Sequence, residues 1–179
     1  MEKTIRLKRE LAYTGMILKI YRDTVVANGI EEVYDYIHHD GAAAVLPVTK
    51  DGKILMVRQY RNALDRFTLE IPAGKVDAPD EPRIECGYRE LEEETGAHCG
   101  RFEYLGVCYP SVAYLTEKIH MYLARDLEFG SSHTDAGEFL DVLEVPLDEA
   151  VQMVMDGKIP DAKTQIALLK TKMIVDSGK

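Results

Sequence analysis

The chain has 179 residues, of which 46% are hydrophobic and 30% are charged. This length fits one domain with at most a small appendage, and the composition allows both a sizeable core and a solvated surface. The formal net charge of −9 argues against non-specific binding of nucleic acid or of a membrane surface. No stretch approaches the roughly 20 apolar residues that span a bilayer.

Cysteine usage and the N-terminal sequence indicate a soluble, cytoplasmic protein. The three cysteines form no C-x-x-C pair, so neither structural disulfides nor a thiolate zinc site is expected. Residues 1–6 lack the apolar block of a signal peptide. Phosphate binding in such an acidic chain would depend on individual arginines or on metal ions held by carboxylates.

The N-terminal part of the chain is predicted to form a small antiparallel sheet. The turn pair Asn28-Gly29 separates segments with strand patterns, which are residues 4–11, 16–26 and 32–38. Three strands alone bury little surface. We therefore expect residues 1–39 to be a subdomain that forms a dimer interface or covers a substrate. The alternative is an ordinary additional sheet.

Residues 40–179 are predicted to form the main domain. Strands are expected at residues 42–48, 53–59, 67–71, 102–109, 118–125 and 140–145, and helices at residues 82–95, 146–156 and 161–176. Gly96 is the expected C-cap of the first helix. Mixed strands with helices at both ends predict an α/β sandwich, which is α+β by another naming.

The predicted helix at residues 82–95 carries an unusual concentration of carboxylates. At about 100° per residue, four of its side chains form a stripe that we expect to face the core: Ile84, Tyr88, Leu91 and Thr95. Glu90 and Glu94 lie four residues apart and project from one side, with Glu93 beside them. Like charges at this spacing, and acids at the C-terminal end of a helix, lower its stability.

Residues that lower the stability of their own helix, as these glutamates do, occur mostly at functional sites. Mg²⁺, which binds carboxylate oxygens together with substrate phosphates, would relieve the repulsion between the glutamates. Mn²⁺ is an alternative ion. A solvated acidic face without a metal is the other interpretation of the same residues.

The flanking residues form a pattern that resembles the Nudix box of Nudix hydrolases. Gly74 and the run Arg89-Glu90-Leu91-Glu92-Glu93-Glu94-Thr95-Gly96-Ala97 match the glycine, Arg-Glu, Glu-Glu and final glycine of that box. The early acid of the box departs from the pattern. Asp80 has the expected spacing from Gly74 and Glu81 has the expected spacing from Arg89, so either can take this role.

Three further segments are similar to the ADP-ribose pyrophosphatase branch of the family. They are Arg58-Gln59-Tyr60-Arg61, Glu70-Ile71-Pro72-Ala73-Gly74 and Asp161-Ala162-Lys163-Thr164. The N-terminal sheet is also typical of this branch. Val112 stands near the position where the branch usually has a proline, which leaves the preferred sugar nucleotide open. The resemblance implies a Nudix-type α/β/α sandwich with a mixed sheet, plus the small N-terminal antiparallel sheet.

The resemblance also implies roles for individual residues. The metal ligands would be Glu90, Glu94, Glu93 and the backbone carbonyl of Ala73, with Glu93 as a ligand or a water-holding group. Arg89 would orient the glutamates through salt bridges, with an ordinary surface arginine as the alternative.

The loop at residues 130–139 would supply the general base, Glu138, with Asp135 or His133 as alternatives. Substrate contacts are expected from Arg61, from Arg58, and from a tyrosine that stacks on the base, Tyr109 or Tyr114. The planar guanidinium group suits phosphate oxygens.

The expected activity is Mg²⁺-dependent hydrolysis of ADP-ribose to AMP and ribose 5-phosphate. Another nucleoside diphosphate sugar, such as GDP-mannose or UDP-glucose, is the alternative substrate. A Nudix domain that senses a nucleotide without cutting it is the alternative from another class. The small-molecule substrate would be the main partner, and a homodimer with shared active sites is expected.

Overall fold

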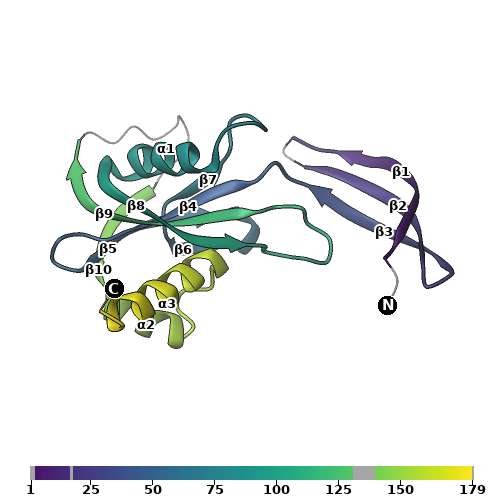
Figure 1. Cartoon of the computed structure of the whole chain (residues 1–179). Coiled ribbons are helices and arrows are strands. Elements are labelled where there is room, and N and C mark those ends of the chain that lie inside the picture. Colours follow the sequence, from purple (N-terminus) through teal and green to yellow (C-terminus); the bar gives the residue numbers. More distant parts are fainter. Residues whose placement is uncertain (1–2, 17, 131–139, 179) are drawn as a thin grey trace. The chain divides into compact units, whose positions relative to one another are not determined.

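The computed structural model describes residues 3–16, 18–130 and 140–178. The chain divides into two compact units, which are described separately. The first comprises Met1–Gly41 and Tyr109–Lys118, and the second comprises Ala42–Cys108 and Ile119–Lys179. Figure 1 labels the elements of both units.

The first unit contains a three-stranded antiparallel sheet in the order β1-β2-β3. Its strands are β1 (Ile5–Thr14), β2 (Lys19–Ala27) and β3 (Ile30–His38). Asn28 and Gly29 have φ of 50° and 80° in the turn between β2 and β3, as the Asn-Gly pair predicts. The segment Tyr109–Lys118 also belongs to this unit. The N–H of Ile37 donates to the carbonyl of Tyr114 at 2.7 Å.

The second unit is the predicted α/β/α sandwich with a mixed sheet. Its four-stranded sheet has the order β7-β4-β9-β8, with β4 parallel to β9, and its three-stranded antiparallel sheet has the order β10-β5-β6. Figure 1 shows α1 on one side of these sheets, and α2 and α3 on the other. The elements are β4 (Ala42–Pro47), β5 (Lys53–Arg61), the 3-10 helix η1 (Asn62–Leu64), β6 (Arg66–Glu70), β7 (Ala73–Lys75), α1 (Arg83–Thr95), β8 (Ala97–Cys108), β9 (Ile119–Phe129), β10 (Leu140–Pro146), α2 (Leu147–Met155) and α3 (Ala162–Asp176).

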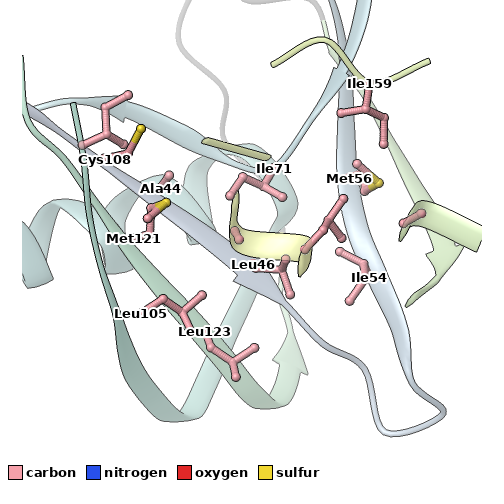
Figure 2. Close-up of a cluster of buried hydrophobic side chains, with 14 of the residues drawn as sticks. Ala44, Leu46, Ile54, Met56, Ile71, Leu105, Cys108, Met121, Leu123 and Ile159 are labelled. Atoms are coloured by element: carbon pink, nitrogen blue, oxygen red, sulfur yellow. The ribbon is translucent and has the colours of Figure 1, made fainter. Parts of the chain in front are cut away.

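The main core lies where β4, β5 and β9 meet the two C-terminal helices. Figure 2 shows part of this cluster, including the fully buried side chains of Leu46, Ile54, Met56, Leu123 and Ile159. Every residue of β4 is buried, as its continuous apolar sequence predicts. This central strand pairs directly with β7, so the core fixes the position of the glycine-containing segment that β7 carries.

The predicted core face of α1 is wrong in part. Ile84 and Tyr88 are 41% and 40% exposed, and Tyr88 stacks on Phe102 at 4.2 Å instead of entering the core. The buried residues of the helix are Cys86, Gly87, Glu90, Leu91 and Glu94. The helix is rotated so that its glutamate row faces inward, because Gly87 has no side chain and allows close approach to the rings of Phe102 and Tyr122.

The end of α1 follows the sequence prediction. Gly96 has a φ of 68° and donates its N–H to the carbonyl of Glu92 at 2.7 Å, which is the left-handed C-cap that glycine favours. Within the described ranges, none of the helices combines the length and the apolar character that a membrane crossing requires.

Shortening a buried side chain of the central strand β4 should reveal how much the core stabilises the fold. We predict that Leu46→Ala, at a fully buried position, lowers the free energy of unfolding by about 2–5 kcal/mol. Met173→Ala, at a side chain that is 74% exposed, should change it by less than about 0.5 kcal/mol. Urea unfolding followed by circular dichroism measures both, and equal losses would contradict this description of the core.

Candidate functional site

The centre of the site is a pair of buried carboxylates on α1. Glu90 and Glu94 are only 8% and 4% exposed. The carboxylate of Glu90 lies against Gly74 of β7, and a Cβ atom on residue 74 would overlap it. A glycine is therefore required at position 74 for a spatial reason, since its missing side chain makes room for the carboxylate.

The segment before Gly74 contacts the second glutamate. The backbone N–H of Ala73 donates to Oε2 of Glu94 at 3.2 Å. The two carboxylates and the carbonyl of Ala73 thus come from adjacent parts of α1 and β7. Mg²⁺ commonly takes one or two carboxylates and completes its shell with water and substrate phosphates. These hard oxygen donors fit such an ion, although the described residues contain no group of three or more His, Cys, Asp and Glu side chains that would hold a metal by themselves.

Arg89 is the cation that contacts this acidic row. Its Nη1 donates to Glu90 at 2.8 Å and to Glu93 at 2.9 Å, and its Nη2 donates to the carbonyl of Lys75 at 2.9 Å. Burial acts to lower the pKa of Arg89, but the charge of Glu90 and the hydrogen bond with Glu81 outweigh it and hold this pKa well above its usual range. The guanidinium therefore stays charged and ties α1 to β7.

Glu81, and not Asp80, makes contact with the box arginine. Oε1 of Glu81 lies 3.4 Å from Nε of Arg89, and Oε2 of Glu81 accepts the backbone N–H of Asp77 at 2.7 Å. Asp80 is exposed. Of the two candidates for the early acid of the box, Glu81 is thus the one that contacts Arg89.

A second buried network surrounds Glu70 at the end of β6. Arg61 donates to it through both Nε and Nη2 at 2.7 Å. Nζ of Lys163 and the hydroxyl of Thr68 donate to it at 2.6 and 2.7 Å. Burial alone would raise the pKa of Glu70, but these hydrogen bonds and the charge of Lys163 outweigh it and lower the pKa to about 2. The hydrogen bond with Glu70 raises the pKa of Arg61 against the effect of burial, and the charges of Glu70, Asp161 and Glu94 add to this rise.

Arg58, which the sequence also singled out, makes an ion pair of its own. It pairs with Asp141 at 3.2 Å and covers the ring of Phe67 at 4.2 Å. Tyr109 and Tyr114 are exposed residues of the first unit. Glu138, with Asp135 and His133, lies outside the described residues.

The pairing of Lys163 with Glu70 is a contact that the sequence alone does not predict. They are 93 positions apart, and pairing across such a distance depends on how α3 packs. A lysine in the first turn of a helix is ordinarily expected to extend its charged side chain into solvent. Here the side chain of Lys163 is only 9% exposed.

The Glu70 network predicts a stability change in acid. A folded-state pKa of about 2, below the ordinary value of 4.5, means that Glu70 contributes stability above pH 4.5 that is lost as the pH falls towards 2. We expect Glu70→Gln to lower the free energy of unfolding at neutral pH, and we expect the gap to the wild type to narrow from pH 4.5 downwards. Urea unfolding over this range measures the gap, and a gap that stays constant with pH would contradict the assignment.

Comparison with known proteins places this geometry in a family. A family model described as the NUDIX domain matches residues 38–168. The chain is 40% identical to the methanol dehydrogenase activator of Bacillus methanolicus and 38% identical to the ADP-ribose pyrophosphatase of Bacillus subtilis, covering in both cases 93% of this chain and 90% of the relative. It is 33% identical to the GDP-mannose pyrophosphatase of Cronobacter sakazakii, over 87% of this chain and 85% of that protein.

A solved structure described as an ADP compounds hydrolase has the same fold. The TM-score is 0.87 at 23% identity, and the match covers 99% of this chain and 97% of that chain. The box residues on α1 and β7, the family model and the relatives agree, and the chain belongs to the NUDIX family.

Proposed function

We propose that this chain is a Mg²⁺-dependent hydrolase that cleaves the pyrophosphate bond of ADP-ribose, giving AMP and ribose 5-phosphate. The observation that carries this proposal is the buried pair Glu90 and Glu94 packed against Gly74. A protein that only binds a nucleotide has no evident need for two carboxylates withdrawn from water. The similarity to an ADP-ribose pyrophosphatase over 93% of the chain supports the substrate.

The ion would be held by Glu90, Glu94 and the carbonyl of Ala73, with Glu93 as a further ligand or a water-holding group. Glu93 is half-buried and already contacts Arg89. When bound, Mg²⁺ would neutralise phosphate oxygens and lower the pKa of a coordinated water. Arg89 would set the orientation of the glutamates, since it holds Glu90 and Glu93 with one nitrogen.

Arg61 is the proposed phosphate contact from the protein side. Its side chain is 41% exposed while two of its guanidinium nitrogens are fixed on Glu70. Arginine presents a planar fork of donors that matches phosphate oxygens. Arg58 is a weaker candidate because it is engaged with Asp141 and Phe67. Tyr109 remains a proposed base-stacking residue on sequence grounds alone.

Glu138 is the proposed general base, and the support for it comes from the sequence resemblance. The step requires removal of a proton from the attacking water, which a carboxylate within hydrogen-bond reach performs. Asp135 and His133 are the alternatives in the same segment. Substitution of each in turn separates them, because only the base should change the pH profile of kcat.

Other sugar nucleotides are the alternative substrates. A relative at 33% identity is named a GDP-mannose pyrophosphatase, and UDP-glucose has the same diphosphate linkage. ADP-ribose is preferred because the relative named for it is more similar and covers more of the chain. A nucleotide-sensing domain without turnover would keep binding but show no Mg²⁺-dependent cleavage.

The activity test is turnover of ADP-ribose, GDP-mannose and UDP-glucose with Mg²⁺ or EDTA, with a phosphatase that releases phosphate only from the cleaved monophosphates. We expect ADP-ribose to be the best substrate. Glu94→Gln should lower kcat by more than about 100-fold, beyond the loss typical for residues outside the metal's ligands. Gly74→Ala should also abolish turnover, because its Cβ displaces the Glu90 carboxylate.

Glu92→Gln is the matched control. Glu92 lies on the same helix, but it is exposed and its carboxylate lies 3.7 Å from His98. Its turnover should equal that of the wild type. Nucleotide binding without turnover of any of the three substrates would reject the enzyme and favour the sensor.

We also propose that the chain forms a homodimer through its N-terminal sheet. The edge strand β1 carries large apolar side chains that are each more than half exposed: Ile5, Leu7, Leu11 and Tyr13. An apolar edge strand of this length is a surface that proteins usually cover. Free thiols at Cys86, Cys99 and Cys108 support a reducing compartment such as the cytoplasm.

A charge in this strand should separate the protomers. We predict that wild-type protein elutes as a dimer at micromolar concentration in chromatography with light scattering. Leu11→Glu should elute as a monomer, because a carboxylate in a buried apolar interface is costly. Met155→Glu, at an exposed position on α2, should leave the dimer intact. A monomeric wild type would reject the proposal.

A further inference from the structure

The N-terminal turn of α3 contains one of the segments that resemble the ADP-ribose pyrophosphatase branch, and it contacts the Glu70 network. Its first residues are tightly bonded. The N-cap Asp161 accepts the backbone N–H of Thr164 at 3.0 Å and its hydroxyl at 2.5 Å. Nζ of Lys163 lies 3.1 Å from Asp161 and 2.6 Å from Glu70. Both Lys163 and Thr164 are buried.

Lys163 acts on the site through Glu70. The carboxylate of Glu70 is 4% exposed and binds Arg61 by two parallel hydrogen bonds. Such a bidentate pair fixes the plane of the guanidinium as well as its position. The lysine holds the Oε2 atom that Nη2 of Arg61 also contacts. Within the part of the chain that the structure describes, no protein acceptor contacts Nη1 of Arg61, so this nitrogen remains available to a ligand.

Thr164 acts on the site through the backbone of the same segment. Its hydroxyl oxygen accepts the N–H of Ile71 at 3.0 Å, while its own proton is directed to Asp161. Two residues further on, the N–H of Ala73 is held by Glu94. The backbone from Glu70 to Ala73 is thus held at three points, which are the side chain of Glu70, the amide of Ile71 and the amide of Ala73.

We propose that Lys163 and Thr164 are positioning residues, which hold Arg61 and the Ala73 carbonyl in the geometry that receives the diphosphate and its metal ion. This inference rests on the proposed function. Lys163 orients Arg61 by fixing Glu70. Thr164 fixes the Ile71 amide and thereby the carbonyl two residues later. Neither residue contacts substrate or metal.

The first test is a double-mutant cycle on kcat/KM. Lys163→Met keeps the length of the side chain and removes its charge, and we expect it to lower kcat/KM by about 10-fold, as for other outer residues that orient a site. In the Arg61→Lys background the same change should cost almost nothing, since coupled residues are non-additive. Lys163→Arg should restore part of the loss.

Lys172→Met is the matched control, because Lys172 lies on the same helix and pairs with the exposed carboxylates of Asp148 and Asp176. It should leave kcat/KM unchanged. If Lys163→Met fails to fold, as judged by thermal melting, Thr164→Val tests the other half of the proposal: it removes the hydroxyl that holds the Ile71 amide, and it should lower kcat/KM. Losses that add in the cycle, in variants that melt as the wild type does, would overturn the proposal.

A second measurement separates this inference from the enzymatic activity. The Nε–H signal of Arg61 in a ¹⁵N NMR spectrum, assigned by its absence in Arg61→Lys, should exchange slowly with water in the wild type. It should broaden or shift upfield in Lys163→Met and stay in place in Lys172→Met. Failure of the wild type to cleave any sugar nucleotide would reject the proposed function alone. An unchanged Arg61 signal in Lys163→Met would reject the positioning role.

Discussion

Two carboxylates on one helix face, those of Glu90 and Glu94, are withdrawn from water in a chain whose surface offers many exposed positions for acids. Burial of a charge is costly unless the charge is paired, and like charges near each other add to that cost. Arg89 and the amide of Ala73 offset part of it. The rest of the site is arranged around this constraint, because a glycine has to stand at position 74 and α1 has to turn its polar row inward.

The segment that ends β6 and forms β7 connects the acidic pair to the second network. Glu70 at its start is bound by Arg61 and Lys163, and Ala73 near its end is bound by Glu94. One short stretch of chain is therefore attached to β5, α1 and α3 at once. A change in any of these elements would be transmitted to the position of the Ala73 carbonyl and of the arginine. This arrangement explains why the site depends on residues far apart in the sequence.

The positions of the helices and strands could be predicted from the sequence, because turn pairs, continuous apolar runs and the Gly96 cap depend only on residues close together in the chain. The box glutamates were found because their spacing is also local. The inward face of α1 was not predicted, since Ile84 and Tyr88 have the apolar character of a core stripe and only packing against Phe102 decides the rotation. The pairing of Lys163 with Glu70 was not predicted either, because it depends on how the last helix docks.

The most direct test of the central claim is the response of the melting temperature to Mg²⁺. If the buried pair binds the ion, Mg²⁺ should raise the melting temperature of the wild type in a concentration-dependent way, because a ligand that binds only the folded state stabilises it. Glu90→Gln should lose this response, while Glu92→Gln should keep it. An equal rise in the wild type and in Glu90→Gln, or no rise in either, would contradict the assignment of Glu90 and Glu94 as the metal site.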